Sequence, residues 1–279
     1  MTFLQKLKKS VLRAGSVLCV GLDPNLDLLP QPIKVQFDTP EEQVVSFCKL
    51  VVDYTSEYCA AFKLNLAFFE ALGSNGLSVL EEVIGHIPDD KIIVADAKRG
   101  DISSTAEHYR KAFWGKFDVD AITLNPLMGF DTLEAFSKDD TKGIYVLTLT
   151  SNTGAADFLK KPFFGFDMMS QFIADQLYER SSGSRSHLGM VIGATQAEEA
   201  ESVLSHHPNG ALLIPGIGAQ GGSISELAKA LKDHKGIPLI NSSRGIIYAG
   251  KDEGDWPEYV ADAAKSMKQK LNQITQQYV

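Results

Sequence analysis

The chain has 279 residues, of which 44% are hydrophobic and 22% charged, as expected of a soluble globular protein with one or two domains. Its formal net charge of −8 argues against a general nucleic-acid surface, which would be basic. No apolar run approaches the roughly 18 residues of a membrane-spanning helix, so we expect no membrane segment. Cys19, Cys48 and Cys59 lack metal-ligand spacing and lie in apolar or helical runs, which predicts reduced, buried thiols in a cytoplasmic protein.

Strand-like and helix-like segments alternate along the whole chain. The S/T-x-x-E patterns at Thr39–Glu42, Thr195–Glu198 and Ser223–Glu226 predict N-terminal caps of helices. Predicted strands cover residues 17–23, 61–67, 92–99, 121–125, 144–150, 189–194, 211–214 and 238–243. Predicted helices include residues 103–117, 131–137, 167–181 and 256–273.

Eight strand–helix units in about 250 residues predict a closed (β/α)₈ barrel, formed as one domain by residues 1–279. The rival fold is an open doubly wound sheet, which would carry a phosphate-binding glycine turn after its first strand. Here the first strand ends in Gly21-Leu22-Asp23-Pro24, and the glycine-rich segment Pro215–Gly222 follows the seventh strand. Because barrels commonly hold phosphate after strands seven and eight, this placement favours the barrel.

The segment Asp96-Ala97-Lys98-Arg99-Gly100-Asp101 ends the third predicted strand. Side chains alternate between the two faces of a strand, so we expect Asp96 and Lys98 to point the same way. A helix that begins near Asp101 would place Asp101 and Thr105 on one helical face. Taken singly, the same residues also fit structural roles, as a helix N-cap at Asp101 and an inward-facing ion pair between Asp96 and Lys98.

Polar residues also follow the other predicted strands, and in a barrel they would meet at the carboxyl-terminal face. The glycines of Pro215–Gly222 let backbone N–H groups approach an anion, with a helix N-terminus directly behind them. Arg244, after the eighth strand, can add bidentate bonds to phosphate oxygens. The sequence therefore predicts a phosphate site at this face. The polar residues at the strand ends are Asp23, Lys63, Asp96, Lys98, Ser151, Gln220 and Arg244.

Together these motifs resemble those of the orotidine 5′-phosphate decarboxylase family, in the type 2 subgroup that carries Asp-Ala-Lys-Arg-Gly-Asp. The family pattern Asp-x-Lys-x-x-Asp-x-x-x-Thr is complete as Asp96, Lys98, Asp101 and Thr105. The resemblance runs in order along nearly the whole chain. Further matching segments are Gly21–Pro24, Phe62–Asn65, Thr150–Gly154, Pro215–Gly222 and Asn241–Gly245.

The resemblance implies decarboxylation of orotidine 5′-monophosphate to UMP and CO₂, a step of de novo pyrimidine biosynthesis, without a metal or organic cofactor. It also implies a homodimer with shared active sites, in which Asp101 and Thr105 contact the ribose bound by the partner subunit. Lys63 would complete a row of alternating charges with Asp96 and Lys98. The implied substrate contacts are Asp23, Lys63, Thr105, Ser151, Gly218, Gln220, Gly221 and Arg244.

The chemistry of this reaction suits the residues of the third strand. Loss of CO₂ from C6 of the pyrimidine leaves a carbanion with no adjacent carbonyl to accept the charge. A fixed ammonium group stabilises such a charge and can donate a proton to the carbon. We therefore expect Lys98 to be the proton donor, with Asp96 and Asp101 keeping it charged and oriented.

Three other functions fit the same barrel. A Mg²⁺-dependent sugar-phosphate decarboxylase or aldolase would use the acidic pair for its metal, and a chelator would inhibit it. A Schiff-base aldolase would use Lys63 or Lys98 and could be trapped with borohydride. A nucleotide-binding barrel without activity would bind UMP and turn nothing over.

Two loops are expected to act as lids, at residues of about 151–166 and 215–222. The first is longer than the usual connection of about 2–6 residues in an α/β unit. Its phenylalanines, Phe158, Phe163 and Phe164, are candidates to cover a ligand. The histidines His86, His108, His206 and His207 lack a nucleophile or metal-ligand pattern, so we expect them at the surface or at helix ends.

Overall fold

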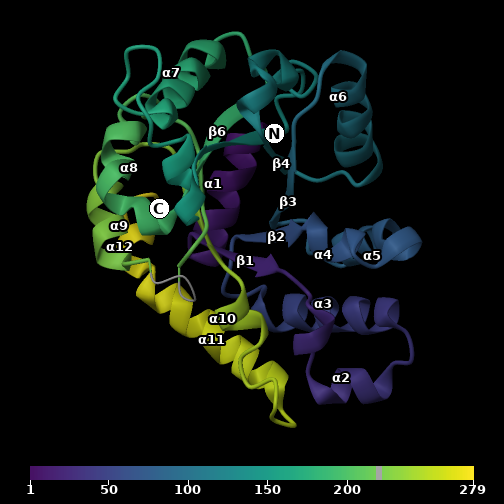
Figure 1. Ribbon diagram of the computed structural model, residues 1–279. Helices are drawn as coiled ribbons and strands as arrows, with labels where there is room; N and C mark the ends of the chain where they lie inside the picture. The colour runs from purple at the N-terminus through teal and green to yellow at the C-terminus, as the bar shows by residue number, and fades with distance from the viewer. Residues whose placement is uncertain (218–221) are drawn as a thin grey trace.

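Eight parallel strands, paired in chain order, close into a barrel in the computed structural model (Figure 1), which describes residues 1–217 and 222–279. The ring closes where β8 pairs with β1, with Leu18 opposite Ile240 and Cys19 opposite Asn241. The predicted (β/α)₈ fold is confirmed. The strands are β1 (Leu18–Leu22), β2 (Ala61–Asn65), β3 (Ile92–Arg99), β4 (Ala121–Leu124), β5 (Gly143–Leu149), β6 (His187–Ile192), β7 (Leu212–Ile214) and β8 (Pro238–Ser242).

Helices surround this ring and cover its outer face (Figure 1). Short 3₁₀ turns and one π-helical turn, Lys111–Lys116, join several of them to the strands. The α-helices in the described part of the chain are α1 (Phe3–Ala14), α2 (Gln31–Gln36), α3 (Pro40–Thr55), α4 (Leu66–Glu70), α5 (Gly76–Ile84), α6 (Ser103–Arg110), α7 (Met169–Ser181), α8 (Ala197–Leu204), α9 (Ile224–Ala230), α10 (Arg244–Ile247), α11 (Trp256–Lys270) and α12 (Asn272–Thr275).

Two of the three predicted helix caps are present. The Thr39 hydroxyl accepts the N–H of Glu42 at 3.2 Å, and the Glu42 carboxylate accepts the N–H of Thr39 at 3.2 Å, so α3 begins with a capping box. Ser223 caps α9 through the N–H of Glu226. The cap predicted at Thr195 is wrong, because its hydroxyl donates instead to the carbonyl of Ser151 at 3.2 Å. A tertiary contact has replaced the local one.

Two predicted helices differ from the structure. The helix expected over 131–137 is only a 3₁₀ turn, Phe130–Leu133, because so short a segment forms too few helical hydrogen bonds to offset the cost of nucleating a helix. The helix predicted over 103–117 does begin at Ser103, after an extended residue at Ile102, so only the alternative start near Asp101 is wrong. The Asp101 carboxylate accepts the N–H of Ile102 at 2.8 Å, so Asp101 does not share a helical face with Thr105.

The amino-terminal helix closes the end of the barrel at which the strands begin, and Figure 1 shows it across the middle of the ring. The Ser10 hydroxyl donates to the carbonyl of Ala60, just before β2, and Lys6 pairs with Asp120, just before β4, at 2.6 Å. Phe3 packs edge-on against Tyr145 of β5, with ring centroids 6.2 Å apart. In the described part of the chain, α1 therefore covers this end of the barrel.

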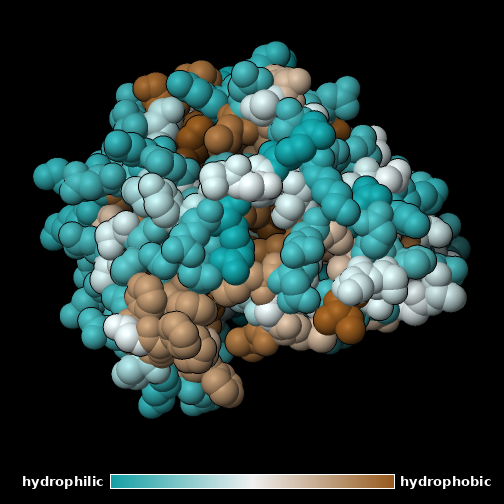
Figure 2. Space-filling view, turned by 90° about the horizontal axis from the view of Figure 1, so that it is seen from above, coloured by the Kyte–Doolittle hydropathy of each residue, from teal (hydrophilic) through white to brown (hydrophobic). Residues whose placement is uncertain are grey.

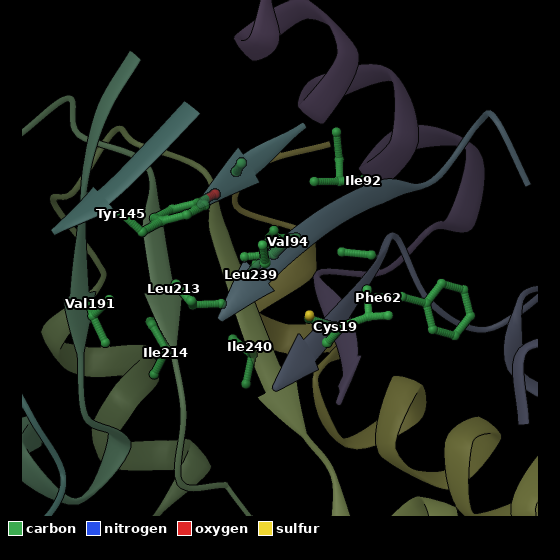
Figure 3. Packing of buried hydrophobic residues seen from close by; sticks show 14 of the residues in the cluster. Cys19, Phe62, Ile92, Val94, Tyr145, Val191, Leu213, Ile214, Leu239 and Ile240 are labelled. Carbon is green, nitrogen blue, oxygen red and sulfur yellow. The ribbon is translucent and has the colours of Figure 1, made fainter. Parts of the chain in front are cut away.

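Inside the barrel, apolar side chains form a packed layer above α1. Tyr145, Leu213, Leu239 and Val94 point toward one another between the strands, whereas Phe62 points outward to the helices (Figure 3). Such layers fill the interior of (β/α)₈ barrels. This layer is the floor on which the polar residues at the strand ends stand.

The cysteines and one histidine test two further expectations. Cys19, Cys48 and Cys59 are free and buried, as predicted. His207 lies just beyond the end of α8, one of the two places expected for it, but it is buried and not at the surface. Its Nε2 lies 2.9 Å from the carbonyl oxygen of Leu188, a contact between distant segments that no local pattern reveals.

Within residues 1–217 and 222–279, no helix has both the length and the apolar character needed to cross a membrane.

A partly buried histidine at the start of β6, His187, predicts a pH-dependent stability. The Nε2 of His187 accepts the N–H of Ala211 at 2.8 Å, and burial lowers the pKa of its imidazole to about 4. In the unfolded chain this pKa returns to about 6.5. Unfolding therefore takes up a proton between these values, so the free energy of unfolding falls as the pH drops through this window. We expect His187→Gln, which keeps an acceptor, to remove about 2 kcal/mol of the decline between pH 7 and about pH 5.

Urea denaturation of the native chain and the variant at several pH values measures this effect. An unchanged slope in the variant would show that His187 is not the titrating group.

Candidate active site

A cavity of about 530 Å³ lies at the end of the barrel where the strands finish. Every strand, or the loop that follows it, contributes to its wall. Of the residues selected from the sequence, those that line it are Asp23, Lys63, Asp96, Lys98, Ser151 and Arg244. The barrel therefore brings together residues that lie more than 200 positions apart in the chain.

Four charged side chains in this cavity form a row of alternating sign. Asp23 Oδ1 lies 3.8 Å from Lys63 Nζ, which donates to Asp96 Oδ2 at 2.9 Å. Asp96 Oδ1 accepts from Lys98 Nζ at 2.6 Å. Lys63 is buried, with 5% of its side chain exposed, whereas half of the Lys98 side chain is exposed. Lys98 is thus the cation at the open end of the row.

The charges of this row keep its two inner members, Lys63 and Asp96, ionised. Burial alone would raise the pKa of Asp96, but the ammonium groups of Lys63 and Lys98 outweigh it and hold that pKa well below its usual range. Burial alone would lower the pKa of Lys63, but the carboxylates of Asp96 and Asp23 outweigh it and hold that pKa above its usual range. The two groups stay charged throughout the pH range in which most enzymes work.

Neighbouring elements hold Asp23 in place at the end of β1. The Ser243 hydroxyl, just after β8, donates to Asp23 Oδ2 at 2.5 Å, and the Tyr248 hydroxyl donates to the Asp23 carbonyl at 2.7 Å. Gly21 makes room for this contact, because a Cβ at its position would lie 2.8 Å from the Cβ of Ser243. Both carboxylates of the row are therefore held by hydrogen bonds as well as by charge.

The third strand carries an irregularity at Lys98. Ala95 pairs with Ile122 of β4, and Arg99 pairs with Leu124, so three residues of β3 face one residue of β4. Within this bulge Lys98 has a φ of +49°, a left-handed conformation that is uncommon for a residue with a side chain. The bulge turns the ammonium group of Lys98 toward Asp96.

Asp101 and Thr105 stand apart from the other predicted site residues. Neither lines the cavity of its own chain, and Thr105 is exposed on α6. No ion pair joins Asp101 to Lys98 in the described residues, so the expectation that Asp101 orients Lys98 does not hold within one chain. Gly218, Gln220 and Gly221, which were also predicted to bind the substrate, lie outside the described residues.

Sequence reasoning missed several cavity residues. Thr123 and Asn125 lie on one face at the end of β4, and Asn241 lies on β8. The same alternation that linked Asp96 to Lys98 could have indicated the two residues of β4. Asn241 begins the segment Asn241–Gly245 that carries the family resemblance, but it was not itself predicted to line the site.

The long loop after β5 contributes aromatic surface near the cavity. Phe158 lines the cavity, whereas Phe163 and Phe164 pack around Phe172 of α7, with ring centroids 5.0 Å and 5.9 Å from it. Phe158 and Phe164 are largely exposed. Figure 2 shows that apolar side chains gather in a patch on one face of the otherwise largely hydrophilic surface.

The ammonium group of a lysine lies between two carboxylates of the cavity. Lys63 Nζ lies between the carboxylates of Asp23 and Asp96, and Asp96 also accepts from Lys98, so ammonium groups already neutralise these carboxylates. In the part of the chain that the structure describes, no three His, Cys, Asp or Glu side chains gather in an arrangement suited to a metal.

Comparisons with known proteins agree with this geometry. Residues 16–259 match the sequence model of the "Orotidine 5′-phosphate decarboxylase / HUMPS family". Orotidine 5′-phosphate decarboxylase of Dehalococcoides mccartyi is 36% identical over the full length of both chains, and that of Leptospira interrogans is 40% identical over 89% of this chain and 88% of its own. The structure of Leishmania donovani OMP decarboxylase superposes with a TM-score of 0.80, at 33% identity and 99% coverage of both chains.

Proposed function

Because this chain belongs to the orotidine 5′-phosphate decarboxylase family, it catalyses the decarboxylation of orotidine 5′-monophosphate to UMP in pyrimidine biosynthesis, and we propose that Lys98 donates the proton to C6. The observation that carries the proposed mechanism is the row Asp23–Lys63–Asp96–Lys98 in the cavity. Its outermost member is an ammonium group that a carboxylate holds at 2.6 Å.

The proposed chemistry follows from this placement. As the C6–CO₂ bond breaks, its electron pair stays on C6, and the Lys98 ammonium stabilises the developing charge. The Nζ–H proton then passes to C6, which leaves a neutral amine on Lys98 and releases UMP and CO₂. A proton from solvent restores the ammonium. Asp96 holds the group during the reaction and does not itself bond to the substrate.

The rest of the cavity suits the remainder of a nucleotide. Arg244 is exposed at its rim, at the start of α10, where it would bind the phosphate. Asp23 and Lys63 would bind the ribose, and Ser151 would bind the pyrimidine edge. Phe158, from the loop after β5, would cover the ligand, and the phosphate contacts would favour closure of the loops over it.

The absorbance of orotidine 5′-monophosphate, followed over time with excess EDTA present, tests this function. We expect turnover to UMP at the same rate with and without the chelator. Loss of turnover in EDTA that Mg²⁺ restores would favour the sugar-phosphate decarboxylase or aldolase. No turnover under either condition, with the protein folded, would leave a phosphate-binding barrel with another substrate.

We also propose that the enzyme works in the cytoplasm as a homodimer with shared active sites. Asp101 and Thr105 lie outside their own cavity, as they would if they reached the ribose in the partner subunit. Ile102, next to Asp101, is 52% exposed, and Leu127 and Met128 in the turn after β4 are 63% and 56% exposed. Exposed apolar surface of this kind commonly marks a protein interface.

Mixing two inactive variants tests the shared site. In the proposed dimer, each site combines Lys98 of one subunit with Asp101 of the other. A dimer of a Lys98→Ala chain with an Asp101→Ala chain would therefore contain one site with both changes and one native site. Random exchange of subunits should therefore restore about a quarter of the native sites. We expect either variant alone to be at least about 10²-fold slower than the native enzyme. Full activity of Asp101→Ala alone, or no gain after subunit exchange, would contradict the proposal.

A further inference from the structure

We infer that Thr123 of β4 is a positioning residue that fixes the Lys98 ammonium, an inference that rests on the proposed role of Lys98. Thr123 lies opposite the bulge of β3, as the one residue of β4 between the pairs Ala95–Ile122 and Arg99–Leu124. Its side chain is 1% exposed and borders the cavity. It is therefore placed where the ladder of the sheet is interrupted.

The hydroxyl of Thr123 makes two hydrogen bonds. One binds the backbone of Lys98 directly, and the other binds Asp96, which in turn holds the Lys98 ammonium. The hydroxyl accepts the backbone N–H of Lys98 at 2.9 Å, so it replaces the ladder bond that the bulge removes. It donates to Asp96 Oδ1 at 3.0 Å, and the same oxygen accepts from Lys98 Nζ at 2.6 Å. One hydroxyl thus holds the lysine at its backbone and, through the carboxylate, at its ammonium.

These two bonds also define what Thr123 does not do. A hydroxyl has a single proton to donate, and here that proton goes to Asp96. Thr123 then has no donor left for a ligand, although it borders the cavity. The proton of this hydroxyl therefore acts on the reaction through Asp96 and Lys98 and not through the ligand.

Lys98 needs such support more than its neighbour Lys63. Lys63 lies on a regular part of β2, is buried, and is near two carboxylates. Lys98 has a half-exposed side chain, a left-handed backbone and one carboxylate partner among the described residues. Without the Thr123 hydroxyl, its N–H would lose its acceptor, and the backbone could relax to a negative φ that carries the ammonium away from Asp96.

Threonine variants can separate the hydroxyl from the shape of the side chain. Thr123→Val keeps the branched shape and removes the hydroxyl, whereas Thr123→Ser keeps the hydroxyl. We expect kcat of Thr123→Val to fall about 10²-fold, the effect of displacing a reacting group by about 1 Å. KM and the dissociation constant of UMP should change less than about threefold, since Thr123 donates nothing to the ligand. Thr123→Ser should recover most of kcat.

Thr148→Val is the matched control. Thr148 is a buried threonine of β5 outside the cavity wall, and its hydroxyl donates to the carbonyl of Val146 at 2.9 Å. This variant should keep the native kcat. If Thr123→Val fails to fold, Thr123→Ala compared with Thr123→Ser gives the same contrast. The inference would be overturned by a native kcat in the variants without the hydroxyl, by equal losses in Thr123→Val and Thr148→Val, or by a serine variant as slow as the valine variant.

A crystal structure of Thr123→Val tests the positioning without any turnover. We expect a negative φ at Lys98 and loss of its contact with Asp96. A native enzyme that does not decarboxylate the nucleotide would remove the proposed function, whereas an unmoved Lys98 in this variant would remove only the inference about Thr123.

Discussion

Replacing Lys98 with alanine should lower kcat for orotidine 5′-monophosphate by at least ~10⁴-fold, the upper range for general acid catalysis. The variant loses the proposed proton donor, and among the described residues that line the cavity the only other ammonium is that of Lys63. Lys63 cannot substitute for it, because it is buried and donates to Asp96 at 2.9 Å. Turnover by the purified variant, compared with the native enzyme, measures the loss.

Binding of the product controls for a general disruption of the site. UMP should bind the Lys98→Ala variant within about tenfold of its native affinity, because the contacts proposed for its phosphate, ribose and base lie elsewhere in the cavity. Near-normal turnover in the variant would end the assignment of Lys98 as proton donor.

Replacing Asp96 with asparagine should lower kcat by about 10²- to 10³-fold, the usual effect of removing one preorganised polar group from an active site. The Asp96 carboxylate accepts hydrogen bonds from Lys63, Lys98 and Thr123, and an amide oxygen holds ammonium groups less strongly. We also expect tighter binding of the substrate and of ligands with a carboxylate at C6. The reason is that the negative charge of Asp96, which is proposed to face the ligand carboxylate at C6, would be gone.

UMP serves as the control for this second effect, because it lacks the carboxylate at C6. Its affinity should change less than that of a 6-carboxylated ligand. Equal tightening for both would indicate a general change of charge, and weaker binding of both would remove the idea of repulsion in the ground state. Thermal unfolding must accompany these measurements, since breaking a buried ion pair can cost about 3–5 kcal/mol of stability.

The barrel was predictable because its signals are local and periodic. Short β-branched runs marked the strands, and alternation along β3 placed Asp96 and Lys98 on one face, where the structure joins them at 2.6 Å. The capping pattern at Thr39 and Glu42 likewise needs only neighbouring residues. In each case the interaction spans a few positions of the chain.

The expectations that failed depend on contacts between distant segments. Thr195 has the same local pattern as Thr39, but the carbonyl of Ser151 lies within reach and takes its hydroxyl. His207 was expected at the surface or at a helix end, and its burial against the strand that contains Leu188 could not be foreseen. Thr123 could not be singled out, because a threonine in a strand is ordinary until the bulge beside it is known.

Chemical restoration of the ammonium at position 98 tests whether this group is the proton donor. Lys98→Cys can be alkylated with 2-bromoethylamine at about pH 8.5, where an exposed thiol is ionised. The native cysteines should not react, because burial raises the pKa of all three and brings that of Cys59 to about 12. We expect Lys98→Cys to be inactive. Alkylation should raise its rate of decarboxylation by at least about 10²-fold over that of the unalkylated variant. A fully alkylated protein, verified by mass, that stays as inactive as its precursor would contradict this expectation.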